Sequence, residues 1–167
     1  MSSTSGYTGP ELAEWLEEMT FLLREASIPF ALIGGASVML YGQRSRTRDI
    51  DFLVQLQENS WPVLDQRLTD AGLRVEAKGP WHHRVWRDRM YADLILAEVP
   101  VQTEAIAQAR MLLLAGIELP VAPPEFIVAL KRLAGRPQDL RDIAEIREGI
   151  TDLDEALVAR LLAPFQD

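Results

Sequence analysis

The chain has 167 residues, a net charge of −8, 48% hydrophobic residues and 25% charged residues. This composition is typical of a globular domain, excludes a disordered chain and argues against a general nucleic-acid coat protein. The chain has no cysteine, which excludes disulfides, a thiolate nucleophile and cysteine-ligated zinc.

The sequence predicts a single domain without a membrane segment. No apolar run approaches the roughly 18 residues that a membrane span requires. The Ser/Thr/Gly-rich N-terminus lacks the basic and apolar regions of a signal peptide, so we expect a cytoplasmic protein. Residues 1–9 are expected to form a flexible tail and residues 10–167 one domain, with a core at about 28–121 and C-terminal helices at 123–163.

The first half of the chain alternates helical and extended patterns. Pro10 is suited to the first turn of a helix, and apolar residues then recur at steps of three and four up to Ala26. Two short strands are predicted at Phe30–Ile33 and Ile50–Val54, with a short helix at Ala36–Tyr41 between them. Ser60 is a candidate N-cap for the next helix.

The second half begins with further strands and ends in helices. A strand is predicted at Leu73–Ala77, a hairpin around Asp88 and Arg89, a helix at about Thr103–Met111 and an extended segment near Ile117–Val121. Three further helices are expected to begin at Pro123-Pro124, at Pro137 and at Thr151 or Asp152. This order predicts an α+β (mixed α/β) fold, a small mixed sheet flanked by helices with a helical C-terminal third.

The C-terminal helices carry both apolar and charged positions. Leu133 and Leu140 are expected among the inward-facing apolar residues. Most charged residues here, including Asp139 and Asp142, are interpreted as members of weak surface ion pairs. Trp86 is interpreted as a core residue.

Three aspartates are the strongest candidates for chemistry. Asp49 and Asp51 are two residues apart, and on a strand such residues share a face. Taken alone, the pair reads as two solvated carboxylates at a strand edge. Asp93, however, lies in the apolar run YADLILAEV, where a carboxylate is costly unless it is paired or bound to metal. Three carboxylates on adjacent strands are suited to a two-metal phosphoryl-transfer site.

Gly34 and Gly35 lie between a predicted strand and a predicted helix. Such glycines allow a tight turn and the close approach of a ligand to backbone amides, and a helix N-terminus favours phosphate. For Gly-Gly alone a simple turn is the better reading, but its nearness to Asp49 and Asp51 makes a phosphate site more specific.

The motif of apolar strand, Gly-Gly, short helix, Gly and Arg-Thr-x-Asp-Ile-Asp resembles the polymerase-beta-like nucleotidyltransferase superfamily. Within it, the chain is most similar to small bacterial nucleotidyltransferase-like proteins related to abortive-infection and toxin–antitoxin enzymes. The segment KRLAGRPQDLRDI resembles a C-terminal helical signature of that group. The resemblance covers roughly Phe30 to Ile143.

The resemblance implies transfer of a nucleoside monophosphate from an NTP, bound with Mg²⁺ or Mn²⁺, to a hydroxyl of RNA (tRNA) or protein. A cognate toxin or antitoxin partner is also implied. The metal ligands would be Asp49, Asp51 and Asp93, and Asp93 would also help to deprotonate the acceptor. The nucleotide would be held by Gly34, Gly35, Ser37, Arg46, Arg48 and Lys131.

Two alternatives remain at the level of sequence. Arg44, Arg46 and Arg48 would share a face if extended and could neutralise phosphates, or they could form a solvated loop that balances the carboxylates. Ala36 stands where many members of the group have serine. The second hypothesis for the whole chain is therefore a non-catalytic nucleotide-binding or protein-binding partner that retains the fold.

Overall fold

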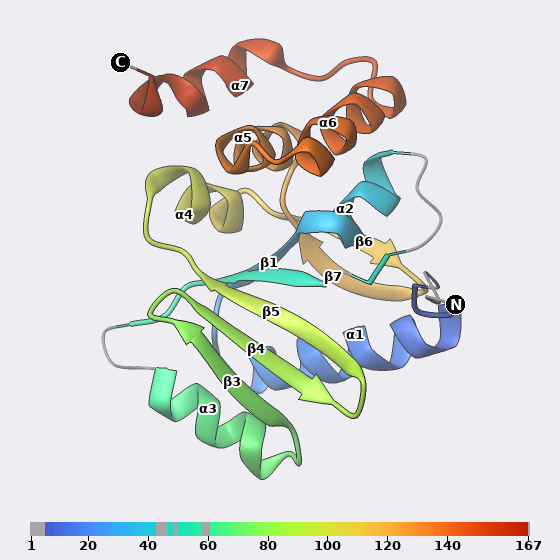
Figure 1. Cartoon of the computed structure of the whole chain (residues 1–167), viewed down its shortest axis with the longest axis vertical. Coiled ribbons are helices and arrows are strands. Elements are labelled where there is room, and N and C mark those ends of the chain that lie inside the picture. Colours follow the sequence, from blue (N-terminus) through green and yellow to red (C-terminus); the bar gives the residue numbers. More distant parts are fainter. Residues whose placement is uncertain (1–5, 43–46, 49, 58–60, 167) are drawn as a thin grey trace.

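The computed structural model describes residues 6–42, 47–48, 50–57 and 61–166. These residues form a mixed seven-stranded sheet in the order β3-β4-β5-β2-β1-β7-β6 (Figure 1). The strands are β1 (Phe30–Ile33), β2 (Asp51–Val54), β3 (Arg74–Gly79), β4 (His82–Arg87), β5 (Met90–Leu96), β6 (Arg110–Leu114) and β7 (Ile117–Val121). The sheet and its flanking helices confirm the predicted α+β class.

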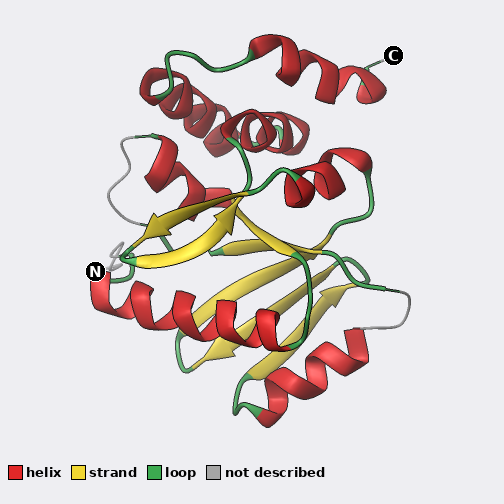
Figure 2. Ribbon diagram, turned by 180° about the vertical axis from the view of Figure 1, so that it is seen from behind, coloured by secondary structure: helices red, strands yellow, loops and turns green. Residues whose placement is uncertain are grey.

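Helices flank the sheet, and the C-terminal helices extend beyond it. They are α1 (Gly9–Glu25), α2 (Gly34–Tyr41), α3 (Trp61–Asp70), α4 (Pro100–Ala107), α5 (Pro124–Ala134), α6 (Pro137–Gly149) and α7 (Glu155–Leu162). Helices α1 and α3 cover one face (Figure 2). Helix α5 packs against α2, α4, α6 and α7, and α5, α6 and α7 stack beyond the sheet (Figure 1). In the described part of the chain, no helix is long and apolar enough to cross a bilayer.

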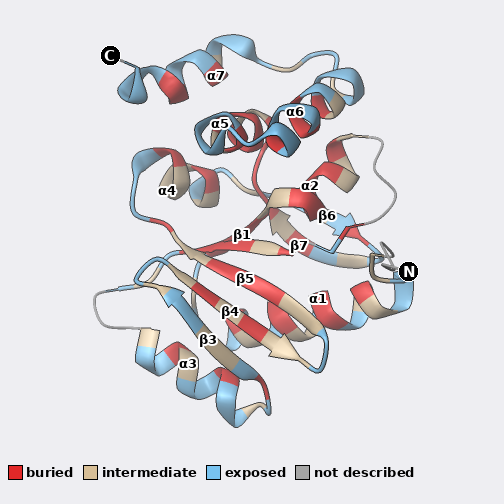
Figure 3. Ribbon diagram, in the orientation of Figure 1, coloured by how far each residue is buried: buried red, intermediate tan, exposed pale blue. Residues whose placement is uncertain are grey.

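The central strands form the core because their side chains are apolar on both faces. Strand β2 runs antiparallel to β1 and parallel to β5. Ala31, Leu32, Phe52, Leu53 and Leu94 are all fully buried. In Figure 3 the buried colour lies along most of β1 and the middle of β5. A strand that is apolar on both faces is typical of the covered centre of a sheet.

Helix α1 begins earlier than predicted. The Thr8 side chain accepts a hydrogen bond from the backbone N–H of Glu11 at 3.3 Å, which caps the helix. Tyr7 packs against the core, and its hydroxyl contacts the backbone of Tyr91 on β5. The sequence predicted a flexible tail at residues 1–9, whereas in the structure Tyr7 contacts the sheet and Gly9 begins α1. Residues 1–5 lie outside the described residues.

The predicted helix at Thr103–Met111 is also wrong in its second half. Helix α4 ends at Ala107, and β6 begins at Arg110 and pairs with β7. Ala115 and Gly116 join these strands and both have positive φ, as in the two-residue turns that match the twist of a hairpin. Pairing with β7 thus overrides the helical spacing that the sequence suggested.

Three predictions near the C-terminus need correction. Leu133 and Leu140 are 40% and 49% exposed rather than inward-facing, because they lie on the outer sides of α5 and α6. The last helix is capped by Asp154, whose side chain accepts a hydrogen bond from the backbone N–H of Leu157 at 3.0 Å, and not by Thr151 or Asp152.

The candidate N-cap Ser60, predicted to begin the helix before β3, lies outside the described residues.

Tyr41 at the end of α2 provides a measurable test of this packing. Its hydroxyl donates to the carbonyl of Ala122 at 2.8 Å, and burial raises the pKa of Tyr41 from 10.0 to about 12. Because burial disfavours the phenolate, this contribution to stability is fully present below pH 10 and is lost as the pH rises through about 12.

We expect absorbance at 295 nm to show one of the three tyrosines ionising near pH 12. Tyr41→Phe should remove that component and leave the others. Circular dichroism recorded along the titration monitors the fold. If Tyr41→Phe keeps its fold but instead removes a tyrosine that ionises near pH 10, the buried position of Tyr41 is contradicted.

Candidate functional site

A cleft of about 380 Å³ opens between the sheet and the C-terminal helices. Its sheet side is lined by Gly34, Gly35, Asp51, His82, Arg84 and Asp93. Its helical side is lined by Lys131, Arg136, Gln138, Asp139 and Asp142. Apolar side chains, among them Ile33, Ile95 and Ile127, complete the walls. Segments distant in the sequence therefore meet in one charged cavity.

Three strands place a row of charges on the sheet side. Asp51 on β2 is the register partner of Asp93 on β5, and Asp93 is the register partner of Arg84 on β4. Register partners on neighbouring strands point to the same face and lie about 5 Å apart. The two carboxylates and the guanidinium are therefore neighbours along one line across the sheet.

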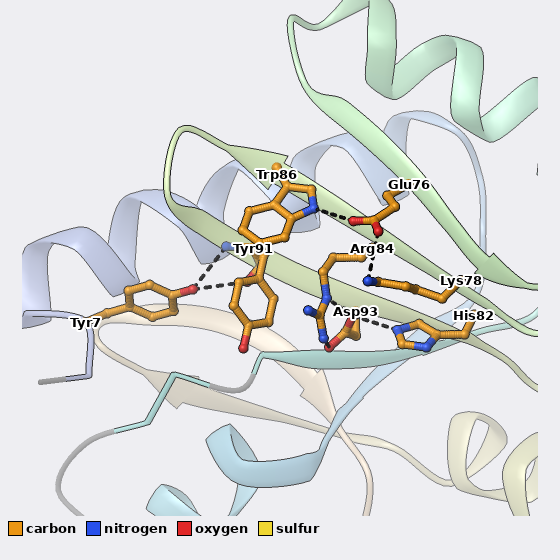
Figure 4. Close-up of polar contacts among 8 residues, drawn as sticks. All are labelled: Tyr7, Glu76, Lys78, His82, Arg84, Trp86, Tyr91 and Asp93. Carbon is orange, nitrogen blue, oxygen red and sulfur yellow. Dashed lines mark hydrogen bonds and ion pairs between the residues drawn. The ribbon is translucent and has the colours of Figure 1, made fainter. Parts of the chain in front are cut away.

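Asp93 in this row is contacted by both Arg84 and His82 (Figure 4). Arg84 donates from Nε to Oδ1 at 2.8 Å and from Nη2 to Oδ2 at 3.1 Å. The His82 Nε2 atom lies 2.6 Å from the same Oδ1. The side chain of Asp93 is only 9% exposed, so these contacts compensate a carboxylate that water hardly reaches. The hydrogen bonds to Asp93 raise the pKa of Arg84 above its usual range.

Gly34 is required where it stands. Its φ is +71°, and a Cβ on this residue would collide with the carboxylate of Asp51. A left-handed backbone and a side chain packed directly against the α-carbon both demand glycine. As a result, the backbone at the start of α2 lies against Asp51, and a ligand that contacts this carboxylate also meets the turn.

The helical side carries a second, buried set of charges on α5 and α6. The Lys131 Nζ atom lies 2.8 Å from Asp142 Oδ2 and 3.6 Å from Asp139 Oδ1. The two aspartates are each 1% exposed and Lys131 is 8% exposed. Burial by itself raises the pKa of Asp139, but hydrogen bonds from the Arg136 side chain and backbone outweigh it and leave that pKa below its usual value.

The structure brings five of the predicted site residues to one cleft, namely Gly34, Gly35, Asp51, Asp93 and Lys131. Ser37 is fully buried, and its hydroxyl donates to the carbonyl of Gly34 at 2.6 Å, so it braces the turn instead of lining the cleft. Arg48 is exposed and is not among the lining residues. Asp49 and Arg46 lie outside the described residues.

Sequence reasoning missed several lining residues. Asp139 and Asp142 were predicted to be surface ion-pair partners, yet both are buried because α6 packs its charged side against Lys131. His82 and Arg84 were not predicted to contact Asp93. The signal that could have shown it is the alternation on β4, which places both on the face of Asp93. Trp86 follows on the same face and is half-buried rather than core.

His83 points to the opposite face from His82. Its Nδ1 atom lies 2.9 Å from Asp65 Oδ1, and its ring stacks on Trp61. Because adjacent residues on a strand face opposite sides of the sheet, the two rings contact different carboxylates, Asp93 and Asp65.

The carboxylates of the cleft suit a hard dication. No set of three or more His, Cys, Asp or Glu residues within the described ranges forms a metal-binding group. Asp51 and Asp93 are nevertheless neighbours at the same cavity, and Mg²⁺ is commonly bound by one or two carboxylates together with substrate phosphates. A carboxylate has about four acceptor positions, and Asp93 uses three of them. These residues therefore fit Mg²⁺ bound together with a nucleotide.

The fold is shared with solved nucleotidyltransferases, although no protein-family model and no curated protein matches the sequence. The chain is similar to the solution structure of the antibiotic-resistance factor ANT(2'')-Ia, with a TM-score of 0.66, 19% identity, and 95% of this chain and 92% of that chain covered. The chain is also similar to the crystal structure of ANT(2'')-Ia in complex with adenylyl-2''-tobramycin. The TM-score is 0.64 and the identity 16%, with 92% of this chain and 98% of that chain covered.

The lincomycin-bound lincosamide antibiotic adenylyltransferase LnuA gives a TM-score of 0.57 and 17% identity, with 81% of this chain and 96% of that chain covered. At these identities the likeness concerns the backbone. The chain therefore shares its fold with these nucleotidyltransferases, as its sequence motifs predicted.

Proposed function

We propose that this chain is a nucleotidyltransferase that moves a nucleoside monophosphate from an NTP to a hydroxyl group of an acceptor. The observation that carries the proposal is the meeting of Gly34, Asp51, Asp93 and Lys131 at one cleft, in a fold shared with antibiotic adenylyltransferases. Each feature alone has a structural explanation, but together they supply what phosphoryl transfer needs: a glycine turn before a helix, carboxylates and a cation.

In this proposal the sheet side of the cleft holds the triphosphate. The turn at Gly34 and Gly35 lets the phosphates approach the backbone, and Asp51 and Asp93 would hold Mg²⁺, with Asp49 as a further proposed ligand. The metal would neutralise charge on the phosphates. Lys131 lines the helical side of the same cleft and would pair with the phosphates. Arg46 and Arg48 belong to the proposed nucleotide site on sequence grounds alone.

The reaction itself is an in-line displacement. The acceptor oxygen forms a bond to the α-phosphorus, the bond from that phosphorus to the bridging oxygen of the β-phosphate breaks, and pyrophosphate leaves. The hydroxyl proton would pass to a carboxylate of the cleft, the role that the sequence resemblance implies for Asp93. The protein contributes positioning and electrostatic stabilisation rather than a covalent intermediate.

The acceptor is the less constrained part of the proposal. The resemblance of the sequence implies RNA (tRNA) or protein, with a toxin or antitoxin partner. Two of the solved structures with this fold instead contain adenylyl-2''-tobramycin and lincomycin. The net charge of −8 disfavours polyanionic acceptors. A small hydroxyl-bearing molecule is therefore included beside RNA and protein in the test.

The proposal is tested by incubating the protein with Mg²⁺, each of the four α-labelled NTPs and three acceptor classes: aminoglycosides and lincosamides, total tRNA, and cell lysate. We expect label to move from one NTP to one acceptor class, and to stay on the NTP when EDTA is present. Absence of transfer to every class, for every NTP, would contradict an enzyme.

The second candidate is a nucleotide-binding module without turnover. It is favoured by one observation: both oxygens of Asp93 are already hydrogen-bonded to Arg84. Calorimetric titration with Mg²⁺ and NTP separates the two functions. Tight binding without label transfer supports the module, whereas binding with transfer supports the enzyme.

A further inference from the structure

The acceptor positions of Asp93 are occupied in an uneven way. Oδ1 receives both Arg84 Nε and His82 Nε2, at 2.8 and 2.6 Å. Oδ2 receives only Arg84 Nη2, at 3.1 Å. Since each carboxylate oxygen has two lone pairs, Oδ1 is saturated and Oδ2 keeps one acceptor position among the residues that the structure describes. Asp93 can therefore bind a cation only through Oδ2.

Arg84 is held by an aromatic frame on the open face of β3, β4 and β5. Its guanidinium carbon lies 4.2 Å from the ring centre of Tyr91 and 5.8 Å from that of Trp86. These two rings pack against each other at 5.0 Å. Such contacts restrict where the guanidinium can lie as well as attracting it.

The frame is fixed in turn by polar contacts (Figure 4). The Trp86 Nε1 atom donates to Glu76 Oε2 at 3.2 Å, and Glu76 is also paired with Lys78 at 2.8 Å. The Tyr7 hydroxyl accepts from the backbone N–H of Tyr91 at 3.0 Å and donates to its carbonyl at 3.2 Å. If Arg84 only balanced the charge of Asp93, its guanidinium would not need these contacts, because charge alone would attract it to the carboxylate.

We propose that Arg84 is a positioning residue, which orients the Asp93 carboxylate through its two-point contact so that the remaining acceptor position on Oδ2 is presented to the metal. The proposal rests on the proposed function. Hydrogen bonds that orient a ligating carboxylate typically matter by 10- to 100-fold in metal affinity or activity.

The sign of the change in metal affinity distinguishes positioning from simple charge compensation. Removing a positive charge beside a metal ligand would by itself strengthen cation binding. If Arg84 instead positions Asp93, its removal weakens binding despite the lost repulsion. Lysine keeps the charge but cannot make the planar two-point contact, so charge compensation predicts that Arg84→Lys behaves like the wild type.

The experiment measures Mn²⁺ binding by the electron paramagnetic resonance signal of the free ion, for the wild type, Arg84→Met and Arg84→Lys. We expect about tenfold weaker binding in Arg84→Met and only partial recovery in Arg84→Lys. Label transfer should show kcat falling by about 10- to 100-fold, with KM for the NTP changed by less than about twofold. Arg74→Met is the matched control, since Arg74 also lies over Trp86, at 4.8 Å, and should leave both quantities unchanged.

Circular dichroism and thermal unfolding establish that each variant is folded, and Arg84→Lys keeps Asp93 paired if Arg84→Met does not fold. Unchanged or tighter Mn²⁺ binding in a folded Arg84 variant overturns the positioning role while leaving the proposed function intact. A wild-type protein that neither binds Mn²⁺ nor transfers label overturns the proposed function, and this inference with it.

Discussion

Asp51→Asn is expected to lower nucleotidyl transfer by at least about 10²–10³-fold, the loss typical of one electrostatic stabiliser of a transition state. Asp51 lines the cleft, is the register partner of Asp93 and lies against the turn at Gly34. Asparagine keeps the shape of the side chain but removes the charge that a hard dication prefers. The measurement is the initial rate of label transfer at saturating NTP over a series of Mg²⁺ concentrations.

The matched control for this substitution is Asp70→Asn. Asp70 is an exposed aspartate at the end of α3 that accepts a hydrogen bond from Gln66 at 2.7 Å and is not among the cleft residues. Its replacement should leave the rate within about twofold, because exposed pairs of this kind contribute little. If the two variants have equal rates, Asp51 is a structural carboxylate, and the proposed metal site is wrong.

Lys131→Met is expected to lower the free energy of unfolding by about 3 kcal/mol or more, the usual cost of breaking a buried ion pair from one side. The side chains of Asp139 and Asp142 are 2% exposed, and Lys131 provides a cation to both at 3.6 and 2.8 Å. Without it, negative charge remains buried between α5 and α6. Urea denaturation followed by circular dichroism measures the change.

A surface pair and a double substitution serve as controls for Lys131. Arg147→Met breaks the exposed pair with Glu155 and should cost less than about 1 kcal/mol. Lys131→Met with Asp142→Leu replaces the buried pair by apolar groups and should recover most of the stability.

The double variant also separates structure from nucleotide binding. If Lys131 contacts the phosphates, the double variant should bind NTP weakly in calorimetric titrations even though its stability has returned. A stable double variant that binds NTP like the wild type would show that Lys131 is structural only. A loss below about 1 kcal/mol in the single variant would contradict the buried pair itself.

Periodicity and turn chemistry predicted most elements, because local signals dominate there. The buried run at Phe30–Ile33, the glycine turn and the proline-led helices α5 and α6 all lie at the predicted places. The failures occurred where long-range pairing decides. Strand β6 forms because β7 lies beside it. Tyr7 is held by Tyr91 on β5, which lies 84 residues away in the sequence. Neither partner is visible in a local window.

The sequence by itself determined the fold class and the motif of glycines and carboxylates around β1 and β2. Those features depend on residue type and short spacing: a positive φ demands glycine at position 34, and alternation on a strand places side chains on alternate faces. Residue types and their spacing were therefore sufficient to predict the nucleotidyltransferase fold.

Only the tertiary structure decided how the charges of the cleft are paired. The register of β2, β5 and β4 brings Asp51, Asp93 and Arg84 into one row, and the packing of α6 against α5 buries Asp139 and Asp142 around Lys131. Sequence separation gives no measure of these distances, because each pair is set by strand register or helix packing. That pairing is what assigns Arg84 its place beside Asp93.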